Sequence, residues 1–488
     1  MLFHSSSFLL LLTATCLLHH FVPRYRIGIL LVSSAIFYAS WNPVFYLVLV
    51  AVVWFNYRIA SDIEQGVQRK QKLVLGIVAD LGILFYFKYF KLACDTLSAS
   101  AAMVGINFTP EASSPFLPLG VSFYTFQNIA YLVDVYYGRA DRARNFKEYL
   151  LYATFFVHLI AGPIIRSRDL IPALHEKPSA TGAQLAEGGF IFLRGIFRKV
   201  LLADRLALIS DPVFAAPSSC SSTAASIAVL AYTFQIYFDF AGYTDMARGA
   251  ALMLGYRLPE NFLNPYLSPS IRDFWRRWHV TLSLWLRDYL YIPLGGGRFG
   301  PWKAARNLLI TMFLGGLWHG ASWTFAVWGL YHGLLLVLHR RVWEPAAGYF
   351  RSRTAGKLPR AFGVLYRAAA VVATFVLVST GWVFFRAHST ADALQLLGRI
   401  AAGAAGNGMP DLPDFGALLW LIPLYLMGLG AIELTRRLFK EVEMKGGRLR
   451  SAAFGASAGM AAAIIAGWLL LVWTGRPGET APFIYFQF

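Results

Sequence analysis

Long apolar runs separated by short links are the feature that most limits what this chain can fold into. Many of the runs are long enough for a helix to cross a bilayer, which takes about 20 residues. Of the 488 residues, 57% are hydrophobic and only 14% are charged, against about a quarter charged in a soluble domain. Because the runs are continuous rather than alternating, they predict spanning helices and not a membrane β-barrel. We therefore expect an all-α polytopic membrane protein.

The net charge of +18 comes from lysines and arginines that gather in the links between apolar runs. Basic links of this kind lie on the cytoplasmic side of membrane proteins, so the charge indicates topology and not a nucleic acid partner. The first apolar run has no lysine or arginine before it and is followed by Arg24 and Arg26. A cleaved signal peptide has the reverse order, so we expect a retained first span with its N-terminus outside.

The alternation of runs and links predicts about ten to twelve spanning or re-entrant helices. We expect them to form one membrane domain over residues 1–488. The regular runs are residues 8–22, 27–40, 44–57, 73–92, 116–137, 368–385, 416–434 and 453–473. In the middle, Gly162-Pro163 interrupts an apolar segment and predicts a broken or re-entrant helix that is buried in protein. Residues 188–209 hold too many basic side chains for a span that faces lipid.

The segment 271–290 has the apolar spacing of an amphipathic helix, with i, i+3, i+4 and i+7 positions on one face. Trp278 belongs to the apolar face, and Arg276 and Arg277 belong to the other. One interpretation is an anchor at the membrane surface. The other is the wall of a cytoplasmic vestibule, whose arginines attract an anionic donor such as coenzyme A. His279 lies at the border of the apolar face and is expected to point into protein.

His319 is one of few ionisable residues deep in an apolar run, and Trp318 and several glycines surround it in the sequence. Burial keeps an imidazole neutral, which is the form a general base needs. A histidine in such a run is commonly a core residue, but these neighbours favour an open niche with a function. Asp239 and Asp245 are further ionisable groups in an apolar context. The candidates for substrate binding are these two with Trp318, Trp278, Arg276 and Arg277.

The motifs of several other chemistries are missing. The sequence has no HxxxH, HExxH or CxxC spacing, and His332 falls on a different helical face from His319. We therefore predict no metal site and no bound cofactor. A Walker motif is also absent, which argues against nucleotide hydrolysis, and we expect neither serine hydrolysis nor dinucleotide chemistry.

Long motifs around these residues resemble the membrane-bound O-acyltransferase family. The likeness covers nearly the whole chain and is strongest to the bacterial branch that serves alginate O-acetylation, with teichoic acid D-alanylation more distant. The motifs are FWRRWHVTLSLWLRDYLYIPLGG at 274–296, LGGLWHGASW at 314–323, YFDFAGYTDMA at 237–247, PLGVSFYTFQNIAYLVDVYYG at 118–138, FVHLIAGPIIRSRDL at 156–170 and FIYFQF at 483–488.

The resemblance implies a ring of helices that encloses a funnel or tunnel across the bacterial inner membrane. The family's central histidine, in Leu-Trp-His-Gly, corresponds to His319, and the second, in Arg-Arg-Trp-His, corresponds to His279. The implied activity moves an acetyl group from a cytoplasmic acyl thioester, acetyl-coenzyme A or another, toward an exported polysaccharide such as alginate. Periplasmic SGNH-like acetyltransferases are the implied partners.

Two other functions stay open on the residues alone. A transporter would use the same intramembrane polar groups as a substrate path, although the two halves of the chain show no matching pair of Gly/Pro-broken helices. A scaffold for polysaccharide export would use both histidines only for packing, and would carry out no acyl transfer.

Overall fold

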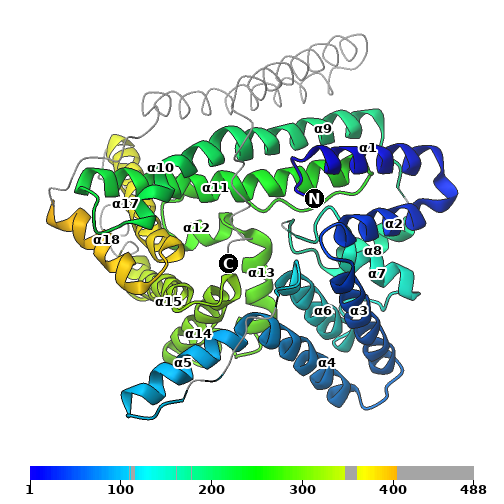
Figure 1. Cartoon of the computed structure of the whole chain (residues 1–488), viewed down its shortest axis with the longest axis horizontal. Helices are drawn as coiled ribbons and strands as arrows, with labels where there is room; N and C mark the ends of the chain where they lie inside the picture. Colours follow the sequence, from blue (N-terminus) through cyan, green and yellow to red (C-terminus); the bar gives the residue numbers. More distant parts are fainter. Residues whose placement is uncertain (109, 111–115, 161, 177, 347–359, 404–488) are drawn as a thin grey trace, which may run out of the picture.

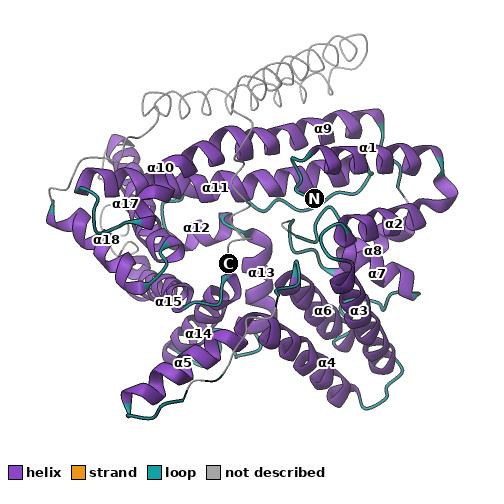
Figure 2. Cartoon of the chain, in the orientation of Figure 1, coloured by secondary structure: helices purple, strands orange, loops and turns teal. Residues whose placement is uncertain are grey.

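The described part of the chain is built of helices and connecting loops (Figure 2). The computed structural model describes all residues except 109, 111–115, 161, 177, 347–359 and 404–488. The α-helices are α1 (Ser6–Phe21), α2 (Arg26–Ala39), α3 (Pro43–Glu64), α4 (Arg69–Leu84), α5 (Phe90–Met103), α6 (Val121–Tyr136), α7 (Phe146–Thr154), α8 (Ser167–Glu176), α9 (Gly182–Ile196), α10 (Asp204–Ala215), α11 (Ser222–Met253), α12 (Ile271–Arg277), α13 (Val280–Leu286), α14 (Pro301–His319), α15 (Trp323–Leu338), α17 (Arg360–Arg386) and α18 (Thr390–Ala402). The all-α prediction is confirmed for these residues.

Several helices are long and apolar enough to cross a membrane. They are Pro43–Glu64, Arg69–Met103, Ser222–Met253 and Gly363–Arg386, and the pair Ser6–Phe21 and Pro23–Ala39, bent by 112°, adds a fifth if it is one span. The chain is therefore a multi-pass membrane protein. The described residues give fewer spans than the sequence predicted, because other apolar runs fold as shorter or interrupted helices. The predicted spans at 416–434 and 453–473 and the motif at 483–488 lie outside the described residues.

Burial separates a central helix from a peripheral one. In the most apolar 18-residue stretch of α11, 78% of the residues are buried in the protein. In the corresponding stretch of the helix Arg69–Met103, 17% are buried. α9 and α10 lie alongside α11 (Figure 1). Glycines allow the close contact of α9 and α11, since a Cβ on Gly242 would lie 2.8 Å from the carbonyl oxygen of Gly195. This packing accounts for the basic segment 188–209, which faces protein as predicted.

The hairpin of α14 and α15 is held by a second pair of glycines. A Cβ on Gly316 would overlap the carbonyl oxygen of Phe325, and a Cβ on Gly329 would overlap that of Met312. The two backbones therefore approach more closely than larger residues would permit. This contact fixes the end of α14, where His319 is the last helical residue.

The segment 271–290 is not the single amphipathic helix that its periodicity predicted. It forms α12, a turn at Trp278 and His279, α13, and a π-helical turn, η5 (Arg287–Tyr291). The break has an identifiable cause outside the segment. The amide of Val280 donates to the backbone carbonyl of Asn261 at 3.0 Å, and that of Thr281 donates to the Asn261 side chain at 3.1 Å. These amides begin α13 instead of continuing α12.

The predicted break near Gly162-Pro163 is confirmed. The described residues between α7 and α8 are not α-helical, and most are buried. Their polar backbone groups find partners in protein: the amide of Phe156 donates to Ser34 Oγ at 3.2 Å, and that of Ile164 donates to Thr281 Oγ1 at 3.0 Å. Irregular backbone at membrane depth needs this kind of internal pairing.

Candidate active site

His279 and His319 are brought together from separate segments. His319 ends α14, and His279 occupies the turn between α12 and α13. The centres of the two imidazole rings lie 6.4 Å apart. His279 is fully buried and His319 is 4% exposed, so the prediction that His279 points into protein is confirmed.

Aromatic side chains surround the pair. Ring centres of Trp318, Trp328 and Phe385 lie 5.0, 5.1 and 5.2 Å from that of His319, and Phe240 lies 4.7 Å from His279. These neighbours belong to three different apolar clusters of the core. The histidines therefore sit where the clusters meet, in surroundings that favour neutral imidazoles.

A hydrogen-bond network determines which nitrogen of His279 carries the proton. Asn261 Oδ1 accepts from the amide and the hydroxyl of Thr281, at 3.1 and 3.0 Å, and lies 3.2 Å from His279 Nδ1. Because this oxygen can only accept, Nδ1 of His279 is the donor. In the neutral ring Nε2 then carries the lone pair. The turn thus presents the basic nitrogen of His279 away from Asn261.

The backbone at His279 also needs this support. Its φ of 42° and ψ of 56° lie in the left-handed region, which residues other than glycine and asparagine adopt at a cost. Asn261 compensates for this cost with contacts to the ring of His279 and to the amides of Val280 and Thr281.

Lys88 and Tyr89 fix the backbone that carries His319. Lys88 Nζ donates to the carbonyl oxygens of Trp318 and His319 at 2.6 and 3.1 Å, and Tyr89 OH donates to that of Leu317 at 2.9 Å. A cation at the C-terminus of α14 also complements the helix dipole. The apolar run 73–92 predicted a span that ends just after these residues. Instead, the helix continues to Met103 through a π-helical turn, η2 (Phe85–Tyr89).

Asp239 and Asp245, predicted to bind substrate, form ion pairs between helices. Asp245 pairs with Arg194 at 2.7 Å and Arg198 at 2.5 Å, and Asp239 pairs with Lys199 at 2.7 Å. Both carboxylates are almost completely buried. A role in binding substrate would require these pairs to open, so that role stays a prediction.

The other predicted binding residues divide between core and surface. Trp318 contacts His319 directly, whereas Trp278 packs in the core with its ring 4.8 Å from that of Trp382. Arg276 is exposed, and Arg277 pairs with Asp273 at 2.9 Å. The structure thus brings Trp318 to the histidine pair and leaves both arginines toward the surface.

An ion-pair network lies just after the C-terminal end of α13. Arg166 Nη2 pairs with Asp288 at 2.5 Å, and Arg287 pairs with the same carboxylate at 2.6 Å. Burial alone would raise the pKa of Asp288, but the hydrogen bonds and charges of Arg287 and Arg166 lower that pKa below its ordinary value of 3.8. Asp288 therefore stays charged and ties η5 to the loop before α8.

Among the described residues, no three His, Cys, Asp or Glu side chains converge in a way that could hold a metal ion. His332 is buried against aromatic rings, with Trp328 at 5.0 Å and Trp275 at 5.3 Å. It lies one helix away from the pair, on α15.

Sequence reasoning missed four residues that position the histidines: Lys88, Tyr89, Asn261 and Thr281. Lys88 carried a usable signal, since it is a cation inside an apolar run. Asn261 and Thr281 carried none, because they lie in a loop and at the start of a short helix whose meeting depends on tertiary structure.

The sequence of this chain is similar to those of a known protein family. The model of the membrane-bound O-acyltransferase family matches residues 139–380. A protein of Azotobacter vinelandii named probable alginate O-acetylase AlgI is 43% identical over 80% of this chain and 76% of its own length. A peptidoglycan O-acetyltransferase of Helicobacter pylori is 37% identical over 75% and 72%. A teichoic acid D-alanyltransferase of Bacillus subtilis is 27% identical over 45% and 58%.

Proposed function

This chain belongs to the membrane-bound O-acyltransferase family and is an O-acyltransferase, and we propose that it moves an acetyl group from a cytoplasmic thioester toward an exported polysaccharide. Three relatives are named for alginate, peptidoglycan and teichoic acid, which are polymers found outside the cytoplasm. Alginate or a similar exopolysaccharide is the acceptor we propose. Such a direction of transfer fits a multi-pass protein of the bacterial inner membrane.

The pairing of His279 with His319 carries the proposal. Forty positions separate them in the chain, yet their ring centres lie 6.4 Å apart inside an aromatic enclosure. Dedicated contacts hold each one: Asn261 binds His279, and Lys88 binds the carbonyl of His319. Contacts that fix the ring of His279 and the backbone of His319 favour a role beyond apolar packing, because buried imidazoles cost free energy.

In the mechanism we propose, His319 is the general base. It removes the proton of an acceptor hydroxyl while the oxygen attacks the acetyl carbonyl carbon. The C–O bond forms, the C–S bond breaks, and the leaving thiolate takes the proton back from the imidazolium. His279 accepts a hydrogen bond at Nε2 from the hydroxyl or relays its proton. The dry aromatic surroundings limit hydrolysis of the thioester.

The donor and acceptor reach the pair from opposite sides in this proposal. Residues 1–488 form one membrane domain of about ten to twelve spanning or re-entrant helices, arranged as a ring around a funnel or tunnel. Arg276 and Arg277 attract an anionic donor, acetyl-coenzyme A or another acyl thioester, on the cytoplasmic side. No resident cofactor takes part. A periplasmic SGNH-like acetyltransferase receives the acetyl group or passes it to the polysaccharide.

The test is acetyl transfer by the purified full-length protein in lipid nanodiscs. Radiolabelled acetyl-coenzyme A and acetyl-loaded acyl carrier protein are offered as donors, with an alginate oligosaccharide or a serine peptide as acceptor. We expect labelled acceptor with the wild type and none above background with His319→Ala. His332→Phe is the matched control, because it removes another buried histidine one helix away.

The outcomes distinguish the three functions. Full transfer by His319→Ala would remove this residue from the mechanism. Flux of an intact substrate into liposomes, without any labelled ester, would indicate a transporter. Normal polysaccharide acetylation in cells that carry both His319→Ala and His279→Asn would indicate a scaffold.

A further inference from the structure

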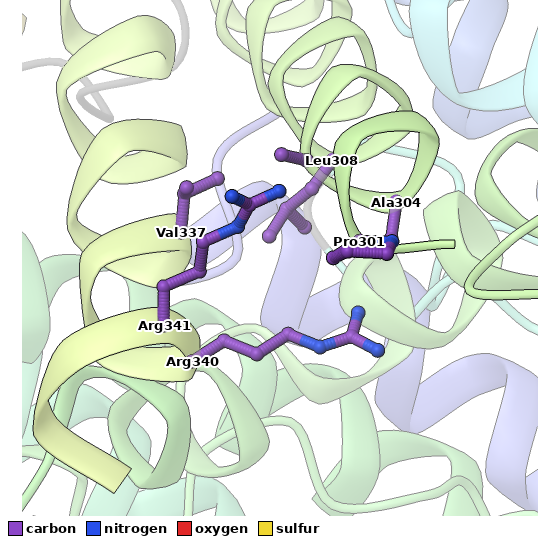
Figure 3. A pocket seen from close by; sticks show the side chains of 7 residues that line it. Pro301, Ala304, Leu308, Val337, Arg340 and Arg341 are labelled. Atoms are coloured by element: carbon purple, nitrogen blue, oxygen red, sulfur yellow. The ribbon is translucent and has the colours of Figure 1, made fainter. Parts of the chain in front are cut away.

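A cavity of about 250 Å³ lies between the start of α14 and the end of α15 (Figure 3). Its apolar walls include Ala304, Ala305, Leu308 and Val337. At a rise of about 1.5 Å per residue, Pro301 beside the cavity is about 27 Å from His319 at the other end of α14. The cavity is therefore separate from the candidate active site.

Two guanidinium groups converge on this cavity. Arg340 and Arg341 belong to the π-helical turn η6 (His339–Trp343) that follows α15, and both side chains extend between the two helices (Figure 3). Arg340 Nη1 donates to the hydroxyl of Tyr291 at 3.4 Å. Within the described part of the chain, neither arginine pairs with a carboxylate, and the nearby Glu344 pairs instead with Arg272.

The guanidinium group of Arg341 has one N–H group without a hydrogen-bond acceptor among the described residues. Its guanidinium carbon lies 4.3 Å from the ring centre of Trp302, while its Nη2 is buried and has no hydrogen-bond partner among the described residues. A buried N–H of a cation is costly without an acceptor. Anionic oxygens satisfy guanidinium groups best, and phosphate matches their planar fork. The first amides of α14 add positive potential from the helix dipole.

The surroundings of the cavity match the boundary between lipid and water. Trp302 is 78% exposed, and Val342 and Trp343 are also exposed. Exposed tryptophans beside arginines are typical of the interfacial belt of membrane proteins. The basic link that follows places this end of the hairpin at the cytoplasmic leaflet, where anionic lipids are enriched. A soluble phosphate would gain nothing from the apolar walls, whereas a lipid would.

We propose that this cavity binds the headgroup phosphate of an anionic phospholipid from the cytoplasmic leaflet. Arg340 and Arg341 contact the phosphate oxygens, and Leu308 and Val337 contact the glycerol and the first methylenes of an acyl chain. The site is independent of acyl transfer, since it lies at the opposite end of α14 from the histidines.

The test is native mass spectrometry of the delipidated full-length protein, titrated with phosphatidylglycerol or phosphatidylcholine. We expect one saturable site that prefers phosphatidylglycerol about tenfold or more. Each charge-assisted hydrogen bond corresponds to about a tenfold change in affinity, so the double variant Arg340→Ala/Arg341→Ala should weaken binding at least that much. Ala305→Phe should weaken it by filling the cavity, with no change in charge.

The control variant Arg58→Ala/Lys70→Ala removes the same charge from exposed residues elsewhere on the predicted cytoplasmic side, and should bind phosphatidylglycerol within about twofold of wild type. An equal loss in control and double variant would overturn the proposal. So would displacement of the lipid by coenzyme A or inorganic phosphate at equal concentration, which would assign the cavity to a soluble anion. If the double variant does not fold, Ala305→Phe decides: unchanged binding would contradict the site.

Discussion

The histidine pair and the ion-pair cluster beside α11 are both buried, but their polar groups have different neighbours. In the cluster, which comprises Arg194, Arg198, Lys199, Asp204, Asp239 and Asp245, charged groups meet opposite charges at 2.5 to 2.8 Å. In the pair, the rings of His279 and His319 are 6.4 Å apart and lie among aromatic rings. The cluster balances its own charges, whereas burial among aromatic rings favours the neutral form of the two imidazoles. The same sequence signal, an ionisable residue in an apolar run, therefore marks two kinds of site.

The largest expected effect concerns the pair. His319→Ala should lower acetyl transfer about 100-fold or more, because general base catalysis contributes about that much. The amount of protein in the membrane should stay within about twofold of wild type. Transfer is measured with labelled donor in nanodiscs, and the amount is measured by blotting of membranes. A variant that transfers normally would place His319 with the structural groups.

The second-largest effect should be a loss of stability when the ion-pair cluster is broken. Asp245→Ala leaves the buried Arg198 and the partly buried Arg194 without their carboxylate, which costs about 3–5 kcal/mol. We expect a lower unfolding temperature in detergent and less protein in the membrane, with unchanged transfer per folded molecule. A large loss of transfer per folded molecule would instead support the predicted role of Asp245 in substrate binding.

A smaller loss of transfer is expected when Asn261, which holds the ring of His279, is replaced. Asn261→Leu removes the acceptor that holds His279 Nδ1, and loss of such a hydrogen bond corresponds to a drop in transfer of up to about tenfold. Asn261→Asp keeps an acceptor and should retain more activity. Rates of both variants are compared at saturating donor. If the two behave alike, the proton position on His279 does not matter for transfer.

The smallest effect should come from His332→Phe. This ring is enclosed by Trp275 and Trp328, and a phenyl ring of similar size removes polar atoms from an apolar site. Transfer and unfolding temperature should stay close to wild type, with transfer within about twofold. Loss of transfer with normal stability would extend the functional region to α15 and make His332 a third functional histidine.

Much of this could be predicted from the sequence because it depends on local pattern. Continuous apolar runs predicted spanning helices, the Gly162-Pro163 pair predicted a break, and the apolar run around His319 predicted a buried imidazole. These signals need only the neighbouring residues.

The rest depends on contacts between distant segments. The turn at His279 forms because Asn261 binds the amides that begin α13, and nothing in the periodicity of 271–290 reports that contact. The pairing of Asp239 with Lys199 required knowing that the π-helical turn after α9, η3 (Phe197–Ala203), lies against α11. The number of spans stays a prediction, since apolar composition does not tell a full crossing from a short buried helix.

Lys88 has a consequence for how this enzyme senses its membrane. It lies in the least buried of the long helices, and it holds the carbonyl groups of Trp318 and His319. A helix that borders lipid changes its tilt when the hydrocarbon layer thins or thickens. Such a tilt would pull on one imidazole of the pair and not on the other, so acyl-chain length of the surrounding lipids should tune the turnover rate.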